Sequence, residues 1–262
     1  MRPLKRFSQN FLTNPFYQKK IVDALNIQAG DMVLEIGPGQ GALTGHLVKK
    51  TCKKRLAVEL DQRMVEHLKT KFGNQLEIIQ ADILTVDLCG LSGGQRLKIV
   101  GNLPYHITSP ILFHLIDHYQ CVSLAVLMTQ KEVGRRICAE PGSKEYGILS
   151  VMTQTFASVR FLFDIKRGNF FPVPKVDSSV ISLSFFERIS RVDDLQLFRK
   201  IVRSSFNFRR KTLKNSLSRI FDEKVLNSLD QSFLQKRPEQ LTVDDFKYIT
   251  NLINKVLNNE TH

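Results

Sequence analysis

The sequence predicts a doubly wound, mostly parallel α/β sheet followed by a small all-helical domain. Two observations support this prediction: short apolar runs alternate with helical patterns up to about residue 188, and only helical patterns follow. Apolar strands that alternate with helices are typical of parallel sheets whose two faces are both covered. We therefore expect two domains, residues 1–188 and residues 189–262.

The expected elements follow one another at short intervals. Asn14 and Pro15 provide an N-cap and a first-turn proline, which together begin a helix well. Strands are expected at 32–36, 55–60, 76–80, 97–100, 122–128, 161–165 and 180–186, and further helices at 41–50, 61–72, 109–118, 130–138 and 148–157. In the second domain, helical patterns cover 195–206, 212–221 and 244–257.

The charge balance predicts a polyanionic partner. The chain has 38 Lys and Arg against 25 Asp and Glu, a net charge of +13, and 42% hydrophobic residues, enough for a packed core. A protein this basic is expected to meet nucleic acid rather than an acidic membrane, with a merely basic solvated surface as the alternative. No apolar run approaches the roughly 20 residues that span a bilayer, and none resembles a signal peptide. We expect a cytoplasmic protein with no membrane partner.

Four cysteines, Cys52, Cys89, Cys121 and Cys138, are spread along the chain. They do not stand at the spacings of metal ligands, and no histidine pair accompanies them. We therefore expect small buried apolar side chains in a reducing compartment, and no metal.

A glycine loop, VLEIGPGQGALT, follows the first expected strand (Val33 to Thr44). Gly37, Gly39 and Gly41 allow sharp turns and close approach of a ligand, and the next helix offers free N–H groups. Their G-x-G-x-G spacing differs from the G-x-G-x-x-G of dinucleotide-binding proteins. The carboxylate of Glu35 would repel a pyrophosphate but suits a ligand with an amino group and a sulfonium. The ligand that fits this loop is S-adenosylmethionine.

Two further acids end neighbouring strands. Glu59 closes the second strand, where it can accept from ribose hydroxyls, and Asp82 follows the third, where it can accept from an adenine amino group. A lone acid would be read as a helix cap or a solvated turn, and Asp61 and Asp87 are read in that way. Acids after three consecutive strands favour a cofactor site, because open α/β sheets bind ligands there. A nicotinamide dehydrogenase is disfavoured by the glycine spacing.

The fourth strand runs into the loop Asn102-Leu103-Pro104-Tyr105. The lone pair of an adenine 6-amino group is delocalised into the ring, so the nitrogen is a poor nucleophile. The side-chain oxygen of Asn102 and the backbone oxygen of Leu103 could accept its two hydrogens and draw it toward a tetrahedral geometry. Pro104 would fix the loop, and Tyr105 would stack on a flipped base. Catalysis would then rest on positioning and electrostatics. The alternative, a turn without a catalytic role, accounts only for the proline.

Several stretches over essentially the whole length resemble the KsgA-type (RsmA) family of small-subunit rRNA adenine N6,N6-dimethyltransferases. They are FSQNFL (7–12), EIGPGQGALT, GNLPY, QKEV (130–133), YGILSV (146–151), FFPVPKVDSSV (170–180) and FNFRRKTLKNSL (206–217). The resemblance implies a Rossmann-like, S-adenosylmethionine-dependent methyltransferase sheet with a small all-α C-terminal domain. It also implies dimethylation of two adjacent adenosines near the 3′ end of small-subunit rRNA, within ribosome biogenesis. Methylases of large-subunit RNA that confer antibiotic resistance share the first three motifs but lack RRKTL.

The resemblance assigns roles to individual residues. Phe170 would hold the target base from the side opposite Tyr105, and His106 stands where family members often carry asparagine. The cofactor site would consist of Asn10, Leu12, Gly37, Glu59, Asp82 and Asn102.

A basic segment without acids lies in the expected second domain. It contains Arg199, Lys200, Arg203, Arg209, Arg210, Lys211, Lys214 and Arg219. A solvated helix face usually mixes charges of both signs, so this segment favours contacts with RNA phosphates. Phe206 and Phe208 are expected in the core of the domain. The best candidates for RNA contact are Arg203, Arg209, Arg210, Lys211 and Lys214. The protein is expected to be a monomer, and the alternative function is a non-catalytic ribosome-assembly or nucleic-acid-binding factor on a methyltransferase scaffold.

Overall fold

The computed structural model describes residues 10–189 and 192–259. The chain forms two compact units. The first runs through Arg135 and resumes over Ala157–Glu187, and the second comprises Arg136–Phe156 and the chain from Arg188 onward. The expected division into 1–188 and 189–262 therefore needs a correction, because residues 136–156 cluster with the second unit.

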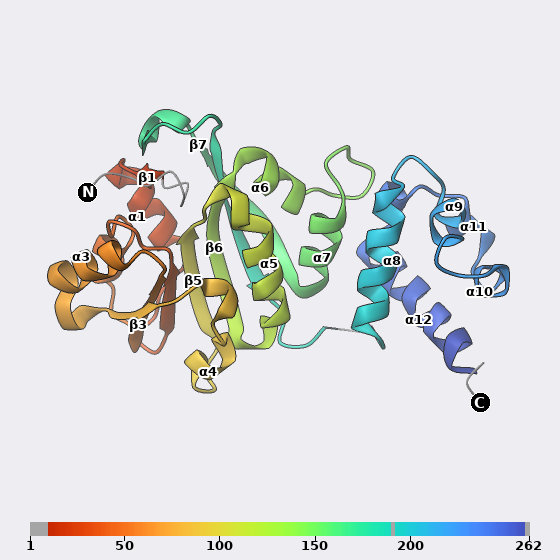
Figure 1. Ribbon diagram of the computed structural model, residues 1–262, viewed down its shortest axis with the longest axis horizontal. Coiled ribbons are helices and arrows are strands. Elements are labelled where there is room, and N and C mark those ends of the chain that lie inside the picture. Colours follow the sequence, from red (N-terminus) through yellow and green to blue (C-terminus); the bar gives the residue numbers. More distant parts are fainter. Residues whose placement is uncertain (1–9, 190–191, 260–262) are drawn as a thin grey trace. The chain divides into compact units, whose positions relative to one another are not determined.

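The first unit is built on a seven-stranded sheet with the order β4-β3-β2-β5-β6-β9-β7 (Figure 1). Its strands are β2 (Met32–Ile36), β3 (Lys54–Glu59), β4 (Glu77–Gln80), β5 (Leu97–Asn102), β6 (Val122–Gln130), β7 (Ala157–Ile165) and β9 (Ser178–Phe185). The first five strands of that order pair in parallel, and β9 pairs antiparallel with both β6 and β7. The sheet is thus mostly parallel, as expected, with an antiparallel pair at one edge.

Helices and 3₁₀ turns precede, connect and follow the strands of this unit. They are α1 (Pro15–Asp23), α2 (Thr44–Leu47), α3 (Gln62–Phe72), α4 (Leu88–Ser92), α5 (Thr108–Asp117) and α6 (Lys131–Ile137), with 3₁₀ turns η2 (Gly73–Gln75), η3 (Ile83–Thr85), η4 (Tyr105–Ile107), η5 (Tyr119–Cys121) and η6 (Arg167–Asn169). Asp61 caps α3 by accepting from the Arg63 N–H at 3.1 Å, as its position predicts. The helix expected at 41–50 is reduced to α2, because turns occupy most of residues 39–43.

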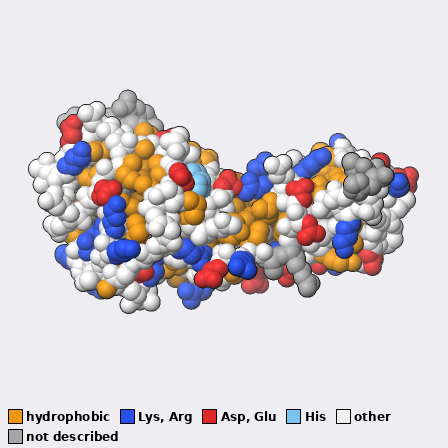
Figure 2. Space-filling model, turned by 90° about the horizontal axis from the view of Figure 1, so that it is seen from below, with side chains coloured by type: hydrophobic (Ala, Val, Ile, Leu, Met, Phe, Trp, Pro, Cys, Tyr) orange, Lys and Arg blue, Asp and Glu red, His pale blue; other side chains and the backbone are white. Residues whose placement is uncertain are grey.

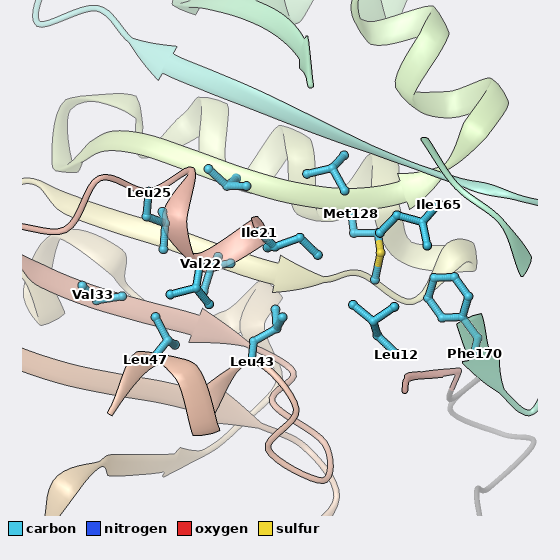
Figure 3. Close-up of a cluster of buried hydrophobic side chains, with 13 residues drawn as sticks. Leu12, Ile21, Val22, Leu25, Val33, Leu43, Leu47, Met128, Ile165 and Phe170 are labelled. Carbon is cyan, nitrogen blue, oxygen red and sulfur yellow. The ribbon is translucent and has the colours of Figure 1, made fainter. Parts of the chain in front are cut away.

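An apolar cluster joins the helices to the sheet near the carboxyl ends of the strands (Figure 3). Ile21 and Val22 of α1 pack with Val100 of β5 and Met128 of β6 in this cluster. Each of these four side chains is essentially inaccessible to solvent. Burial of this kind contributes on the order of 25 cal/mol per Å² of apolar surface, so the cluster provides a rigid support for the loops above it.

A two-stranded antiparallel ribbon, formed by β1 (Phe11–Leu12) and β8 (Phe170–Phe171), was not expected from the sequence. Phe11 lies opposite Phe171, and Leu12 lies opposite Phe170. Leu12 and Phe170 enter the apolar cluster, where Figure 3 shows them beside each other. The ribbon therefore ties the segment after residue 9 to the sheet.

The second unit is helical. It contains α7 (Ile148–Phe156), α8 (Leu195–Asn207), α9 (Leu213–Leu217), α10 (Glu223–Asn227), α11 (Gln231–Leu234) and α12 (Val243–Asn259), with the 3₁₀ turn η7 (Pro238–Gln240). Helix α7 packs on α8 and α12, and the ring of Tyr146 meets that of Phe206 edge to face at 6.0 Å. The Gly142 N–H also donates to the Glu239 oxygen at 2.7 Å. These contacts are the reason that residues 136–156 belong to this unit.

The cysteines differ from expectation. Cys89 of α4 and Cys121 of η5 form a disulfide with 5.2 Å between their Cα atoms, while Cys52 and Cys138 are free and partly buried. The pair forms because α4 packs against η5, a contact that the 32-residue separation in sequence does not reveal. The expectation of four unpaired thiols is wrong for Cys89 and Cys121.

Positive charge is spread over the surface. Figure 2 shows Lys and Arg side chains scattered across the face in view, with Asp and Glu among them. Across the described part of the chain, no helix has the length and apolarity needed to cross a bilayer.

Candidate active site

A cavity of about 350 Å³ opens at the carboxyl ends of the parallel strands. Its walls come from the ends of β2, β3 and β5, from the turn after β4, and from β1. Nine residues predicted from the sequence line it together: Asn10, Leu12, Gly37, Glu59, Asp82, Asn102, Leu103, Pro104 and Tyr105. Open α/β sheets bind ligands at this position, so the structure brings the two predicted motifs into one site.

The glycine loop after β2 forms one wall. Gly37, Gly39 and Gly41 have φ values of 62°, 55° and 81°, in the left-handed region that favours glycine. A Cβ atom on Gly39 would lie 2.8 Å from the ring of Phe11, and one on Gly41 would lie 2.6 Å from the ring of Phe72. The loop therefore needs glycine both for its turns and for close packing.

Glu35 lies deep in this wall and is only 1% exposed. Its Oε2 accepts from the hydroxyl of Thr44 at 2.6 Å. The pKa of the Glu35 carboxyl is raised to about 7, chiefly by burial and also by the nearby Glu59, while the bonds from Thr44 oppose the shift. The carboxyl therefore keeps its proton to a higher pH than an ordinary glutamate, whereas the sequence alone suggests a plain carboxylate.

Glu59 at the end of β3 is held by two backbone donors. Its Oε2 accepts from the Gly39 N–H at 3.0 Å, and its Oε1 accepts from the Asp61 N–H at 2.9 Å. The side chain is 7% exposed and lines the cavity. Each carboxylate oxygen can accept more than one hydrogen bond, so this carboxylate is fixed and still able to accept from a ligand.

Asp82 follows β4 and caps η3, with its Oδ1 accepting from the Leu84 N–H at 3.0 Å. Its Oδ2 has no hydrogen-bond partner within the described parts of the chain. Ile83 and Leu84 line the cavity beside it. This wall therefore offers one acceptor next to apolar side chains, which suits a flat heterocycle with an amino group.

Asn102 ends β5 at the opposite wall. Its Nδ2 donates to the backbone oxygen of Asn10 at 2.8 Å. The amide nitrogen can only donate, so Oδ1 is the atom of this side chain that can accept from a ligand. This bond between β5 and the residue before β1 fixes the orientation of the side chain.

The rest of the loop is held by the fold beneath it. The Leu103 N–H donates to the Met128 oxygen at 3.0 Å, and the Pro104 oxygen accepts from the Ile107 N–H at 3.1 Å. The Leu103 side chain is 1% exposed. The loop is therefore anchored at both sides of its proline.

The ring of Tyr105 is oriented by a hydrogen bond that the sequence did not predict. Its hydroxyl lies 2.8 Å from the Ser178 hydroxyl at the start of β9. Burial raises the pKa of Tyr105 above its ordinary value, the Ser178 bond opposes that shift, and Asp177 adds to it. The phenol thus stays neutral at physiological pH and presents an uncharged ring to the cavity.

Phe170, expected to face Tyr105 across the target base, does not line the cavity. It is 3% exposed and packs in the apolar cluster with Leu12, which does line the cavity. Successive residues of a strand point to opposite sides, so β8 turns Phe170 inward and Phe171 outward, 62% exposed. In this structure Phe170 supports the cavity wall from behind.

The cations of the basic segment of the second unit differ in their exposure. Arg203, Arg210, Lys211 and Lys214 are exposed. Arg209 instead forms an ion pair with Glu239 at 2.6 Å and donates to the Ser143 oxygen at 3.2 Å. The prediction of a phosphate contact at Arg209 therefore does not fit this geometry, because its guanidinium is engaged within the unit.

Sequence reasoning missed several residues of the cavity. Phe11 lines it and touches the glycine loop, Thr44 holds Glu35, and Ser178 holds Tyr105. A signal existed for Thr44, which closes the EIGPGQGALT motif, but the contacts of the other two depend on pairing between distant strands.

The sheet order and the acid-lined cavity beside an Asn-Leu-Pro-Tyr loop define a Rossmann-like α/β methyltransferase. A solved dimethyladenosine transferase from Plasmodium falciparum aligns with a TM-score of 0.83 and 29% identity, over 94% of this chain and 98% of that chain. The chain belongs to the ribosomal RNA adenine dimethylase family, whose model matches residues 3–255.

Other relatives agree with this assignment. A Chlorobium phaeobacteroides protein named ribosomal RNA small subunit methyltransferase A is 43% identical over 92% of this chain and 90% of its own length. A Coxiella burnetii protein of the same name is 40% identical over 95% of this chain and 97% of its own. The solved 23S rRNA methyltransferase ErmE aligns with a TM-score of 0.68 and 26% identity, over 92% of this chain and 99% of that chain.

Proposed function

We propose that this protein dimethylates the 6-amino groups of two adjacent adenosines in the 3′-terminal hairpin loop of small-subunit rRNA, with S-adenosylmethionine as the donor. The observation that carries the proposal is the placement of Asn102 and Tyr105 in the same cavity as Glu35, Glu59 and Asp82. Membership of the family and the names of the relatives support it. The step would belong to small-subunit ribosome biogenesis.

The hydrogen-bond acceptors of the cavity fit S-adenosylmethionine. Glu59, with both oxygens already oriented by backbone N–H groups, would accept from the ribose hydroxyls. Asp82 would accept from the adenine amino group, and Glu35 would face the amino group of the methionine part. Gly37, Asn10 and Leu12 would cover the ligand. When bound, S-adenosylmethionine supplies an electrophilic methyl group on a sulfonium.

The loop after β5 would activate the acceptor nitrogen. The Asn102 Oδ1 and the Leu103 backbone oxygen would each accept one hydrogen of the adenine amine. Two such bonds favour a tetrahedral nitrogen, whose lone pair is then free to attack in line. The nitrogen sheds a proton after attack, so no general base is needed. The residues contribute preorganised electrostatics. In other enzymes, removing one such preorganised hydrogen-bonding group lowers kcat by about 10²–10³-fold.

The target base would stack on Tyr105. Because the Ser178 hydroxyl holds the phenol at 2.8 Å, the ring is set before the base arrives. A flipped adenine would gain the stacking that it loses in the RNA. Phe170 would contribute indirectly, by supporting Leu12.

The exposed cations of the second unit would contact RNA phosphates. Arg203, Arg210, Lys211 and Lys214 have the exposure that this role requires. Because the proposed substrate is the ribosomal small subunit, we place the action of the protein in the cytoplasm. The proposed chemistry requires one copy of the chain, which is consistent with a monomer.

The decisive experiment supplies radiolabelled S-adenosylmethionine and unmethylated small subunits to the purified protein. Label recovered as N6,N6-dimethyladenosine at two adjacent positions is the expected result. Tight binding to subunits without transfer of label would instead identify a non-catalytic assembly factor. In a parallel incubation with large subunits, label on large-subunit RNA and none on the small subunits would contradict the proposed substrate.

A further inference from the structure

An exposed aromatic ring stands beside the cavity wall. Phe171 is 62% exposed and lies directly opposite Phe11 in the ribbon of β1 and β8. Residues directly opposite each other in an antiparallel pair project to the same face. Phe11 lines the cavity and reaches Gly39, and Phe171 shares the face of the ribbon that carries Phe11.

The other face of the ribbon packs the ribbon against the apolar cluster. Leu12 and Phe170 are both 3% exposed and enter the apolar cluster. Phe171 takes no part in that cluster, and the exposed Val173 continues the apolar surface beyond it. Folding of the ribbon therefore does not explain the aromatic residue at position 171.

The chain on either side of Phe171 is basic. Lys166, Arg167 and Lys175, all within five residues of it in the sequence, are exposed. The one acid of the segment, Asp177, accepts from Lys166 at 3.1 Å and from the Arg167 N–H at 3.0 Å, so its charge is compensated. An aromatic face among cations suits a nucleic acid strand, whose base can stack while its phosphates meet the charges.

The ribbon is also linked to the acceptor loop. Asn10, whose oxygen holds the Asn102 amide at 2.8 Å, immediately precedes β1. Phe171 is thus connected to Asn102 through the ribbon. Asn10 bonds to Asn102 and precedes Phe11 in the chain, and Phe11 lies opposite Phe171.

We propose that Phe171 is a stacking platform for the nucleobase next to the adenosine bound at Asn102 and Tyr105. This inference rests on the proposed function. Flipping the target adenosine out of its stack leaves the adjacent base with an uncovered face, and Phe171 covers it. Phe171 is then a positioning residue that selects for an RNA strand with a stackable neighbour, and it does not touch the reacting atoms.

The test compares Phe171→Ala, Phe171→Leu and Phe171→Trp with wild type. The dissociation constant and KM for unmethylated small subunits are measured, together with the affinity for S-adenosylhomocysteine and the melting temperature. Phe161→Ala is the matched control, because Phe161 is 48% exposed but belongs to β7 and not to the ribbon. Protein-free RNA of the same sequence is measured in parallel.

Removal of one stacked base contact by alanine weakens binding about 5- to 150-fold. We expect that loss of affinity in Phe171→Ala and in Phe171→Leu. The dissociation constant of Phe171→Trp should stay within about threefold of wild type, or about 0.65 kcal/mol. Phe161→Ala should show no change. Affinity for S-adenosylhomocysteine and the melting temperature should stay at their wild-type values, which a structural role would not allow.

Two results would overturn the proposal. Leucine performing as well as phenylalanine would indicate apolar contact without stacking. A loss on subunits with no loss on protein-free RNA that the wild type binds would place Phe171 against a ribosomal protein. Both results are obtained with a wild type that methylates RNA. A wild type that does not methylate RNA would refute the proposed function itself, so the two failures can be told apart.

Discussion

The amide of Asn102 is held by the backbone oxygen of Asn10 at 2.8 Å, although the two residues are 92 positions apart in the chain. This bond sets which atom of the amide faces the cavity. It also means that Asn10 is part of the acceptor site, so that changes at either residue affect the same geometry.

Asn102→Ala should lower the rate of methyl transfer by about 10²–10³-fold, because one of the two acceptors for the amine hydrogens is lost. Single-turnover kinetics with unmethylated small subunits measure the chemical step directly. The melting temperature and the affinity for S-adenosylhomocysteine are the controls. Undiminished transfer in a folded variant that binds the cofactor would refute the mechanism.

Tyr105 contributes a ring and a hydroxyl, and two variants separate them. Tyr105→Phe keeps the ring and loses the 2.8 Å bond to Ser178, so the expected loss is about 0.5–1.5 kcal/mol, or about 2- to 12-fold in kcat/KM. Tyr105→Ala removes the stacking as well and should lose considerably more. Ser178→Ala should match Tyr105→Phe, and the double variant should add little to either. Fully additive effects would show that the two hydroxyls act independently.

Glu35 makes the stability of the free protein depend on pH. Its pKa is raised to about 7 in the folded state by burial, so the folded protein holds a proton that the unfolded chain releases near pH 4.5. Stability from this group is therefore present below about pH 4.5 and lost as pH rises through 7, by about 3 kcal/mol. The amide of Glu35→Gln does not titrate. In urea unfolding, the free energy of unfolding of this variant minus that of wild type should therefore grow by about 3 kcal/mol between pH 4.5 and 7.5. An advantage independent of pH would contradict the prediction.

Lys211 and Arg209 are close in sequence and should behave differently. Lys211→Ala removes an exposed cation and should reduce the slope of log affinity against log salt for RNA by about 0.7–0.9, with little change in melting temperature. Arg209→Ala breaks the 2.6 Å pair with Glu239, so it should lower the melting temperature of the second unit. Titrations of RNA at several salt concentrations and calorimetry distinguish the two. Equal salt effects of both variants would argue that Arg209 leaves Glu239 to meet phosphate.

The sequence was informative wherever a pattern is local. Asp61 caps α3 as expected, and the apolar run that includes Val100 forms a buried strand of the sheet. The motifs at Gly37 and Asn102 converge because strand ends of a parallel sheet meet at one edge. Each of these inferences needs only the alternation of elements and the chemistry of a few adjacent residues.

The missed features depend on partners far away in the chain. Each strand of the ribbon has two residues, too few to show an alternation of apolar and polar side chains. The sequence therefore could not predict that Phe170 points into the core. Arg209 lies in a run without acids, yet Glu239 reaches it from 30 residues further on. The disulfide of Cys89 and Cys121 likewise follows from the packing of α4 on η5.

The interrupted first unit has a consequence for biosynthesis. Residues 136–156 are translated before the helices α8 and α12 that cover them, so the ring of Tyr146 leaves the ribosome without its neighbour Phe206. The sheet faces a similar delay, because β9 must insert between β6 and β7 before the edge is complete. A nascent chain that stops near residue 156 therefore exposes two unfinished surfaces at once, and completion of the carboxyl-terminal helices closes the last of them.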